Sequence, residues 1–360
     1  MSQSDVTEVG LSVIVQGLAA RVRLVGSDSE SLPLAEWSRC LLAEPSGDDL
    51  DLPPVALERG HRLQRRVTLG LISGSAGLLM WHAGAVAAPD GRVVALVAPS
   101  GGGKSTAVAA LARHGWGYVT DETLGVSTDG IVAPYPKPLA FRRDEAIEKV
   151  SIGPDQLGLA PLPAGELKLA RLLILRRDPQ VAVATVRPMA LLDAVLELVA
   201  SSSSLTALPS PLSQTCAMIR RCGGVFEVSY ADASQLHVPI RALVADTSHA
   251  WTETLEPWAS ISHSDGPSRQ MPGTVVRAPF LDGVATSDEV MLLVGSVPIR
   301  LSGIGASIWL AAERGIATVD IPDLLVRHHG QHARADQLAN EAVHELLAAG
   351  VLVESPPVDT

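Results

Sequence analysis

Residues 98–105 have the residue types and spacing of a phosphate-binding loop. They are Ala-Pro-Ser-Gly-Gly-Gly-Lys-Ser, with alanine where the usual pattern begins with glycine. The three glycines let successive backbone N–H groups curl around a phosphate. Lys104 would then reach the β- and γ-phosphates of ATP, and the Ser105 hydroxyl would ligate Mg²⁺. The predicted ATP-binding residues are Ser100, Gly101, Gly102, Gly103, Lys104, Ser105 and Thr106.

Two elements must position this loop. Val93–Val97 is an unbroken apolar run, which predicts a strand buried on both faces of a parallel sheet. A helix is expected from Lys104 to about His114, where Gly115 provides a stop. The positive end of that helix would add to the attraction for phosphate. The alternative is an ordinary glycine-rich turn between a strand and a helix.

Two carboxylates follow the next predicted strand, Trp116–Val119. Phosphoryl transfer needs a carboxylate near the nucleotide, either to hold Mg²⁺ or to take the proton of the acceptor hydroxyl. Adjacent side chains on an extended backbone point in different directions, so Asp121 and Glu122 could divide these roles. The alternative is a pair of turn-forming or helix-capping residues.

His82 lies in the apolar stretch Leu78–Ala88, which predicts a strand that turns through Pro89-Asp90-Gly91 into the strand before the loop. A lone histidine on an apolar strand is usually a core residue whose ring nitrogens are satisfied. Because this strand would neighbour the nucleotide loop, a functional role for His82 stands beside that interpretation.

Three stretches together resemble the catalytic domain of HPr kinase/phosphorylase, and more closely the HPr-kinase-like proteins found in peptide-modification clusters, including those that phosphorylate lasso peptides. These are His82–Val86, Ser100–Thr106 and Arg113–Glu122. The resemblance implies an ATP-dependent kinase that uses Mg²⁺, held by the residues matching Ser105 and Asp121. It implies catalytic roles for His82, Lys104, Asp121 and Glu122, although the family has aspartate at the last position. The family's later glutamate-bearing metal motif has no counterpart.

Pro134–Arg143 resembles the proline-rich strand that follows the acidic pair in the same subgroup. Proline suits an edge strand at the rim of a site. Lys137, Arg142 and Arg143 could face a phosphate or the acceptor, but a solvated surface position is the expectation for each of them.

The composition restricts the partners. The chain has 360 residues, 47% of them hydrophobic, and a formal net charge of −11. This charge disfavours nucleic acid or an anionic membrane surface as a partner. The uncharged stretch Val67–Ala88 is too polar and too flexible for a membrane span. Cys40, Cys216 and Cys222 form no metal-type cluster and suggest free buried thiols in a reducing cytoplasm.

The pattern of elements predicts four regions: an N-terminal β/α region at 1–75, an α/β P-loop domain at 76–245, a linker at 246–273 and a small α+β domain at 274–354. In the last, short strands at 274–278, 289–294 and 297–301 are followed by three helices. Gly303–Arg314 would be capped by Ser302, the second would begin at Asp320, and the third would be capped by Asp336. A short strand would return at 351–353.

The C-terminal order resembles PqqD-like domains, the RiPP recognition elements, in Val297–Leu310 and Asn340–Val353. In that family a leader peptide adds to the third strand and lies against the third helix. The resemblance implies a groove of Val297, Ile299, Leu301, Leu338, Val343 and Leu346. A generic winged-helix domain is the alternative, and because this stretch is not basic, DNA binding is disfavoured.

Two functions follow from these patterns. The first is an ATP-dependent kinase that phosphorylates a hydroxyl, plausibly of serine, on a precursor peptide recruited by its C-terminal domain. The second is a non-catalytic ATP-binding adaptor that presents the leader peptide to a partner modifying enzyme. A kinase of a small metabolite is weaker, because it leaves the C-terminal domain unused. The sequence leaves open whether the chain forms a homo-oligomer.

Overall fold

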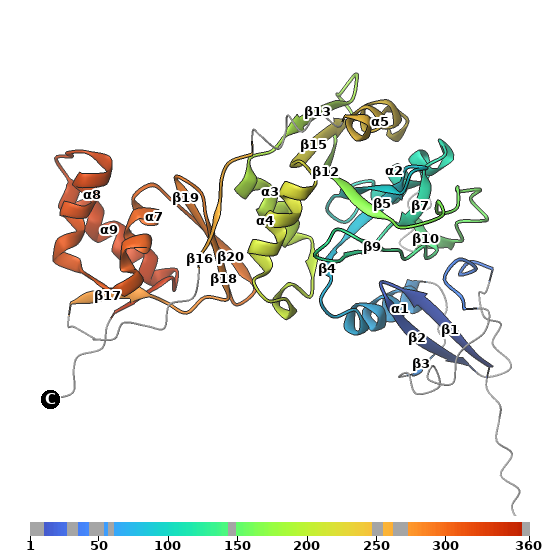
Figure 1. Ribbon diagram of the computed structural model, residues 1–360, viewed down its shortest axis with the longest axis horizontal. Helices are drawn as coiled ribbons and strands as arrows, with labels where there is room; N and C mark the ends of the chain where they lie inside the picture. Colours follow the sequence, from blue (N-terminus) through green and yellow to red (C-terminus); the bar gives the residue numbers. More distant parts are fainter. Residues whose placement is uncertain are drawn as a thin grey trace, which may run out of the picture. The chain divides into compact units, whose positions relative to one another are not determined.

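The computed structural model describes residues 11–26, 35–42, 54–56, 61–142, 149–246, 255–261 and 273–354 (Figure 1). The chain divides into two compact units. Unit 1 comprises Met1–Leu208 and Ala217–Leu255, and unit 2 comprises Pro209–Cys216 and Glu256–Thr360. Helix α4 (Pro211–Arg221) therefore contributes residues to both units. The described residues contain no helix that is long and apolar enough to cross a membrane.

Unit 1 is built around a six-stranded mixed sheet in the order β13-β15-β12-β6-β5-β7. The strands are β5 (Ala83–Ala87), β6 (Arg92–Val97), β7 (Gly117–Thr120), β12 (Lys168–Arg177), β13 (Thr185–Pro188) and β15 (Val225–Tyr230). β6 is parallel to β12 but antiparallel to β5, which corrects the expectation of a parallel sheet around Val93–Val97. The reason is the short turn at Pro89–Gly91, because a connection of that length can only join antiparallel strands.

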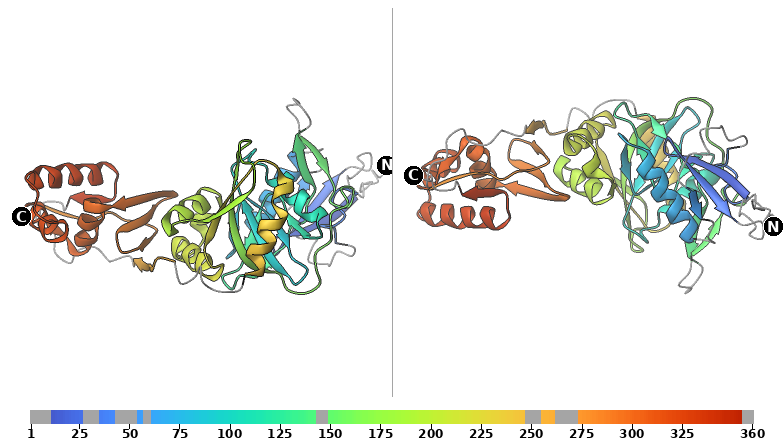
Figure 2. Two further views of the ribbon diagram at one scale, coloured as in Figure 1. Left: turned by 90° about the horizontal axis from the view of Figure 1, so that it is seen from above. Right: turned by 90° about the horizontal axis from the view of Figure 1, so that it is seen from below.

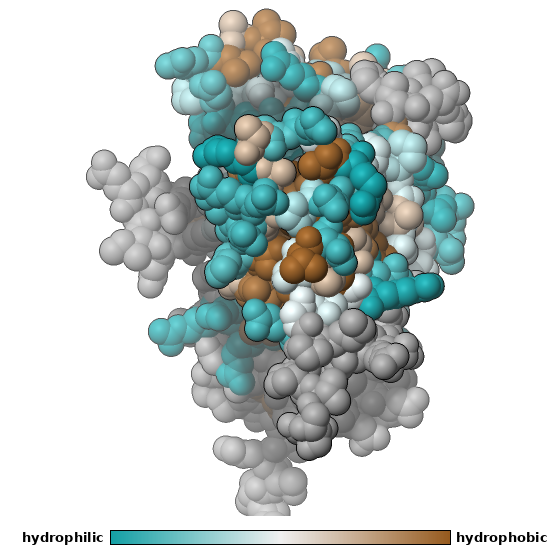
Figure 3. Space-filling view, turned by 90° about the vertical axis from the view of Figure 1, so that its left-hand side faces the viewer, coloured by the Kyte–Doolittle hydropathy of each residue, from teal (hydrophilic) through white to brown (hydrophobic). Residues whose placement is uncertain are grey.

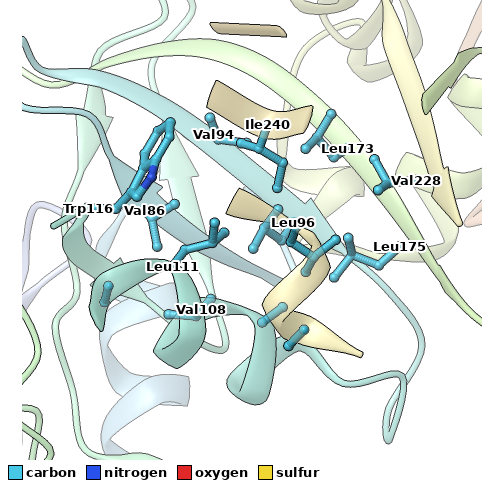
Figure 4. Close-up of a cluster of buried hydrophobic side chains, with 14 of the residues drawn as sticks. Val86, Val94, Leu96, Val108, Leu111, Trp116, Leu173, Leu175, Val228 and Ile240 are labelled. Atoms are coloured by element: carbon cyan, nitrogen blue, oxygen red, sulfur yellow. The ribbon is translucent and has the colours of Figure 1, made fainter. Parts of the chain in front are cut away.

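Helix α2 (Lys104–Arg113) covers one face of this sheet, at the bounds that the sequence predicts. Val108 and Leu111 of α2 pack with Leu96 of β6 and with Ile240 of α5 (His237–Ala245) in one buried cluster (Figure 4). Gly84 of β5 allows the close approach of the helix, since a Cβ atom there would lie 2.5 Å from a methyl group of Val108.

The predicted strand Leu78–Ala88 is in fact two strands that belong to different sheets. β4 (Leu79–Trp81) joins a smaller sheet in the order β14-β4-β8-β9, and β5 joins the main sheet. The chain changes sheets at His82, whose backbone N–H donates to the Ser201 carbonyl at 2.6 Å. The other strands of the smaller sheet are β8 (Leu124–Val126), β9 (Val132–Ala133) and β14 (Ser202–Ser203). β14 directly follows α3 (Leu191–Ala200).

The N-terminal region forms a hairpin covered by a helix. β1 (Leu11–Gly17) and β2 (Ala20–Gly26) pair antiparallel, and β3 (Pro54–Ala56) adds to β2. Apolar residues of α1 (His61–Gly74) pack on the hairpin, and Arg62, Arg65 and Arg66 of the same helix are exposed. A separate two-stranded sheet consists of β10 (Leu139–Arg142) and β11 (Lys149–Ile152).

Unit 2 contains two small sheets and three helices, α7 (Gly303–Ala311), α8 (Ile321–His329) and α9 (Ala335–Ala348). The first sheet has the order β16-β18-β19-β20, and the second has the order β21-β17-β22. Their strands are β16 (Ala259–Ile261), β17 (Thr274–Arg277), β18 (Asp282–Ala285), β19 (Glu289–Val294), β20 (Val297–Ser302), β21 (Ile316–Ala317) and β22 (Leu352–Glu354). The red helices α8 and α9 lie side by side in the views of Figure 2.

The three predicted helices and the returning strand of unit 2 are confirmed. The short strand β18 was not predicted; it pairs with β19, whereas β17 pairs with β21 and β22. The third helix begins at Ala335, one residue before the cap expected at Asp336. β16 lies within the stretch 246–273 that the sequence suggests as a linker; of that stretch, 247–254 and 262–272 lie outside the described residues.

Candidate active site

Strand directions bring the three predicted catalytic stretches to one edge of the main sheet. β6 and β7 run in the same direction, because each is antiparallel to β5, which lies between them. The carboxyl ends of β6 and β7 and the amino end of β5 therefore meet at the same edge. The phosphate-binding loop follows β6, Asp121 follows β7, and His82 precedes β5.

The loop itself has a backbone that requires glycine. Gly101 and Gly103 have φ angles of +83° and +87°, which favour glycine over any residue with a side chain. A Cβ atom on Gly102 would lie 2.9 Å from the Cβ atom of Ala98. The alanine that departs from the usual pattern is thus accommodated because residue 102 has no side chain.

Lys104 is the first residue of α2, and its side chain is buried against the loop. Its Nζ donates to the carbonyl oxygens of Ala98 at 2.6 Å and Pro99 at 3.2 Å. These bonds hold a positive charge beside the backbone N–H groups of the loop. That arrangement suits a lysine that contacts the phosphates of a nucleotide.

Ser105 and Asp121 form an oxygen pair at the start of α2. The Ser105 hydroxyl donates to Oδ2 of Asp121 at 2.9 Å, and the Ala140 N–H approaches the same oxygen at 3.5 Å. A hydroxyl and a carboxylate are ligands of the kind that Mg²⁺ prefers. No group of three or more His, Cys, Asp or Glu side chains able to hold a metal occurs among the described residues. This donor set therefore fits an ion that also uses phosphate oxygens as ligands.

Lys137 is buried, which corrects the expectation of a solvated surface charge. Its side chain is 1% exposed, and Nζ lies 2.8 Å from Oδ1 of Asp121 and 3.1 Å from Oε2 of Glu122. Nζ also donates to the Pro138 carbonyl at 3.0 Å. Burial lowers the pKa of Lys137, but the two carboxylates outweigh it, so the pKa lies above its usual value and the side chain stays charged.

Tyr118 fixes the backbone at Lys137 through a hydrogen bond. The hydroxyl of this buried tyrosine donates to the Lys137 carbonyl at 2.8 Å and approaches Oδ1 of Asp121 at 3.5 Å. Burial and the neighbouring Asp121 charge raise the pKa of Tyr118 well above its usual value, so the phenol remains protonated. The side chain of Arg142 and all of Arg143 lie outside the described residues.

His82 faces the same pocket as Lys104 and the acidic pair, and its ring is not enclosed in the apolar core. Burial and the nearby Lys104 charge lower the pKa of His82, and the opposing effects of Glu122 and Asp121 are smaller. The imidazole is therefore neutral at pH 7. A neutral imidazole beside a carboxylate can accept or pass a proton.

The pocket also includes residues that sequence reasoning missed. Gln64 of α1 is 1% exposed and lines the pocket with Phe141 of β10. Its Nε2 donates to the Ser151 hydroxyl, whereas its Oε1 is buried and has no hydrogen-bond partner among the described residues. No motif in the N-terminal region indicated this role, because Gln64 reaches the pocket only through the packing of α1.

Two further missed residues lie at the carboxyl ends of β15 and β12. The Tyr230 hydroxyl donates to the Gly102 carbonyl at 3.4 Å, and a Cβ atom on Gly103 would lie 2.8 Å from that hydroxyl. The same position would lie 3.9 Å from Cδ of Arg177. β12 is parallel to β6, and β15 is parallel to β12. The carboxyl ends of both strands therefore reach the edge of the sheet that carries the loop.

The resulting pocket has a volume of about 250 Å³. Of the predicted catalytic and ATP-binding residues, all except Gly102 line it.

The three cysteines are free and buried as expected. Burial raises the pKa of Cys216 and Cys222 to about 12, so neither is a thiolate nucleophile.

The predicted peptide groove in unit 2 is made of residues in different environments. Val297 is 59% exposed, and Ile299 and Leu338 are half-buried. Leu301, Val343 and Leu346 are buried in the unit's core cluster. Among the described residues β20 pairs only with β19, so its outer edge is unpaired there. Figure 3 looks onto the side of unit 2 that carries α8 and shows small hydrophobic patches among hydrophilic side chains.

Comparison with known proteins finds likenesses among solved structures. No protein-family model matches the chain, and no curated protein matches it. A similar solved structure is that of the Hpr(Ser) kinase/phosphatase from Coxiella burnetii, with 15% sequence identity and a TM-score of 0.26. The match covers 46% of this chain and 93% of that chain. A TM-score of 0.26 is too low to show a shared fold, so no role is transferred from that structure to the residues of this site.

Proposed function

We propose that the protein is an ATP-dependent kinase that phosphorylates a hydroxyl, most simply of serine, on a ribosomally made precursor peptide. The observation that carries the proposal is the Ser105–Asp121 pair, 2.9 Å apart at the end of a glycine-rich loop that also holds Lys104. This combination supplies a phosphate cradle, a cation and the oxygen ligands of Mg²⁺ in one pocket.

The side chains of Asp121 and Glu122 differ in their exposed fraction, and we assign them different roles on that basis. The Asp121 side chain is 3% exposed and faces Ser105, so these two residues would hold Mg²⁺. Mg²⁺ bound there would offset the negative charge of the transferred phosphoryl group. The Glu122 side chain is 25% exposed, which makes it the carboxylate that an acceptor can reach. Lys104 would bind the β- and γ-phosphates.

The proposed reaction is a direct transfer. The acceptor oxygen forms a bond to the γ-phosphorus, the bond from that phosphorus to the β,γ-bridging oxygen breaks, and ADP leaves. The hydroxyl proton passes to Glu122, and neutral His82 stands beside it to relay the proton onward. Gln64 and Phe141 would line the acceptor's side of the pocket.

Recruitment of the peptide is assigned to unit 2. The unpaired edge of β20 supports this, because an extended peptide can add to such an edge through backbone hydrogen bonds. Exposed Val297 would provide an apolar contact for the added strand. The precursor's leader is the proposed partner.

A second function is favoured by one observation. Lys137 neutralises part of the charge of both Asp121 and Glu122, which would weaken them as metal ligand and base. The protein would then bind ATP without transferring phosphate and present the leader peptide to a partner modifying enzyme.

The two functions are separated by measuring binding and transfer on the same protein. Calorimetry with Mg·ATP tests the nucleotide site, and radiolabelled γ-phosphate with a serine-containing precursor peptide tests transfer. Binding with transfer supports the kinase, whereas binding of ATP and peptide without transfer supports the adaptor. Absence of ATP binding contradicts both.

A further inference from the structure

Lys137 occupies an unusual position for a charged side chain. All three of its ammonium protons can be accounted for by acceptors within 3.1 Å, namely Asp121, Glu122 and the Pro138 carbonyl. Burial of an unpaired ammonium group is costly, so this arrangement requires both carboxylates as partners.

The position of the ammonium group determines which carboxylate oxygens remain for a metal ion. Oδ1 of Asp121 and Oε2 of Glu122 face Lys137, whereas Oδ2 of Asp121 faces Ser105. The two oxygens of Asp121 therefore contact different groups, the Lys137 ammonium group and the Ser105 hydroxyl. The acidic pair therefore already contacts one cation, the Lys137 ammonium group. Oδ2 of Asp121 remains directed toward Ser105, next to the nucleotide loop.

We propose that the Lys137 ammonium group takes the place of a second divalent cation between Asp121 and Glu122. The site then binds its nucleotide together with a single Mg²⁺, which Ser105 and Oδ2 of Asp121 hold. This proposal deepens the proposed function and rests on it for the nucleotide, but the role of Lys137 toward the acidic pair can be tested without ATP.

The charge balance explains the expected behaviour of variants. The two carboxylates and one ammonium group leave one net negative charge, which suits one further cation together with the phosphates. Lys137→Met keeps an apolar stem of similar length but leaves buried Asp121 and half-buried Glu122 without their counter-ion. A divalent cation should then bind between them, because it restores the missing positive charge.

The first measurement is thermal unfolding of the full chain without nucleotide. Adding MnCl₂ to about 100 times its dissociation constant should raise the unfolding temperature of Lys137→Met by about 5 °C or more, and that of the wild type by far less. Lys168→Met is the matched control, since Lys168 makes an exposed ion pair with Glu166 and should behave as the wild type.

The second measurement counts Mn²⁺ bound with a non-hydrolysable ATP analogue, by electron paramagnetic resonance. The wild type and Lys137→Arg should each bind one ion, and Lys137→Met should bind two. Lys137→Met/Glu122→Gln removes one charge of each sign, so it should fold without metal and bind one ion.

Several outcomes overturn the proposal. These are a second Mn²⁺ in the wild type, no additional Mn²⁺ in Lys137→Met, or a Lys137→Met variant that Mn²⁺ cannot stabilise. If the wild type fails to bind the ATP analogue, the proposed function fails, whereas the unfolding measurement still decides the role of Lys137.

Discussion

Two regions are proposed to bind ligands: the edge of the main sheet that carries the phosphate-binding loop in unit 1, and strand β20 in unit 2. They differ in the kind of groups that they offer to a ligand. The first buries charged groups against one another, as in the contact of Lys137 with Asp121. The second combines apolar side chains, such as exposed Val297, with a backbone edge that no described strand pairs with. Changes at the first should therefore alter chemistry strongly, and changes at the second should alter binding with little effect on stability.

The largest effect is expected at the acidic pair. Asp121→Asn and Glu122→Gln keep the shape of each side chain but remove its charge. Phosphoryl transfer should fall by about 100-fold or more in either variant, because metal-ligand and base roles are each worth that much. Transfer is measured with radiolabelled ATP. Asp129→Asn, in an exposed turn, is the matched control and should retain full activity. Full transfer by both variants would refute the proposed mechanism.

Lys104→Ala should produce the next largest effect. It removes the ammonium group that the loop carbonyls hold at the phosphate cradle. Charge-assisted hydrogen bonds are worth about 1.5–3 kcal/mol, so affinity for Mg·ATP should fall by about 10- to 100-fold. Isothermal titration calorimetry measures it, with Lys168→Ala as a surface control. Unchanged affinity in Lys104→Ala would show that the nucleotide binds elsewhere.

These two lysines show why only part of the site was predictable. Lys104 donates to the carbonyl oxygens of Ala98 and Pro99, so a local pattern of eight residues contains both of these contacts. The partners of Lys137 lie about fifteen residues earlier and meet it only because β7 and the segment before β10 converge. A charged residue in a proline-rich segment suggests a surface, and no local feature of the sequence contradicts that.

The same distinction applies to the fold. An unbroken apolar run predicted β6, the loop motif predicted α2, and capping residues predicted the helices of unit 2. The division of Leu78–Ala88 at His82 was not predictable, because both halves are apolar and the change of sheet depends on a hydrogen bond to Ser201. Gln64 reached the pocket through the packing of α1, for which the N-terminal region offers no motif.

A pair of glycine variants compares the packing of the two units. Gly84→Ala places a methyl group 2.5 Å from Val108 and should destabilise unit 1 by about 1–3 kcal/mol through overpacking. Gly305→Ala in α7 meets nothing closer than 3.9 Å and should be neutral or stabilise unit 2 by up to about 1 kcal/mol. Differential scanning calorimetry of the full chain measures both. Equal effects would mean that the approach of α2 to β5 is looser than the structure indicates.

The smallest effect on stability is expected at Val297, where the proposed peptide edge can be tested without disturbing the core. Val297→Glu changes a side chain that is 59% exposed, so the free energy of unfolding should shift by no more than about 0.5 kcal/mol. Val343→Glu would place a carboxylate in the core cluster of unit 2 and unfold that unit, so it could not separate binding from folding.

Binding is measured by fluorescence polarisation with a labelled leader peptide of a candidate precursor and the full chain. Val297→Glu should weaken binding about 10-fold, because the new carboxylate must be desolvated beside an apolar strand. Val319→Glu is the matched control, since Val319 is 81% exposed and belongs to a different element, the short 3₁₀ helix Thr318–Asp320 just before α8. Equal binding by both variants would remove β20 as the peptide edge, and it would leave the nucleotide pocket of unit 1 as the part of the molecule to which a ligand is assigned.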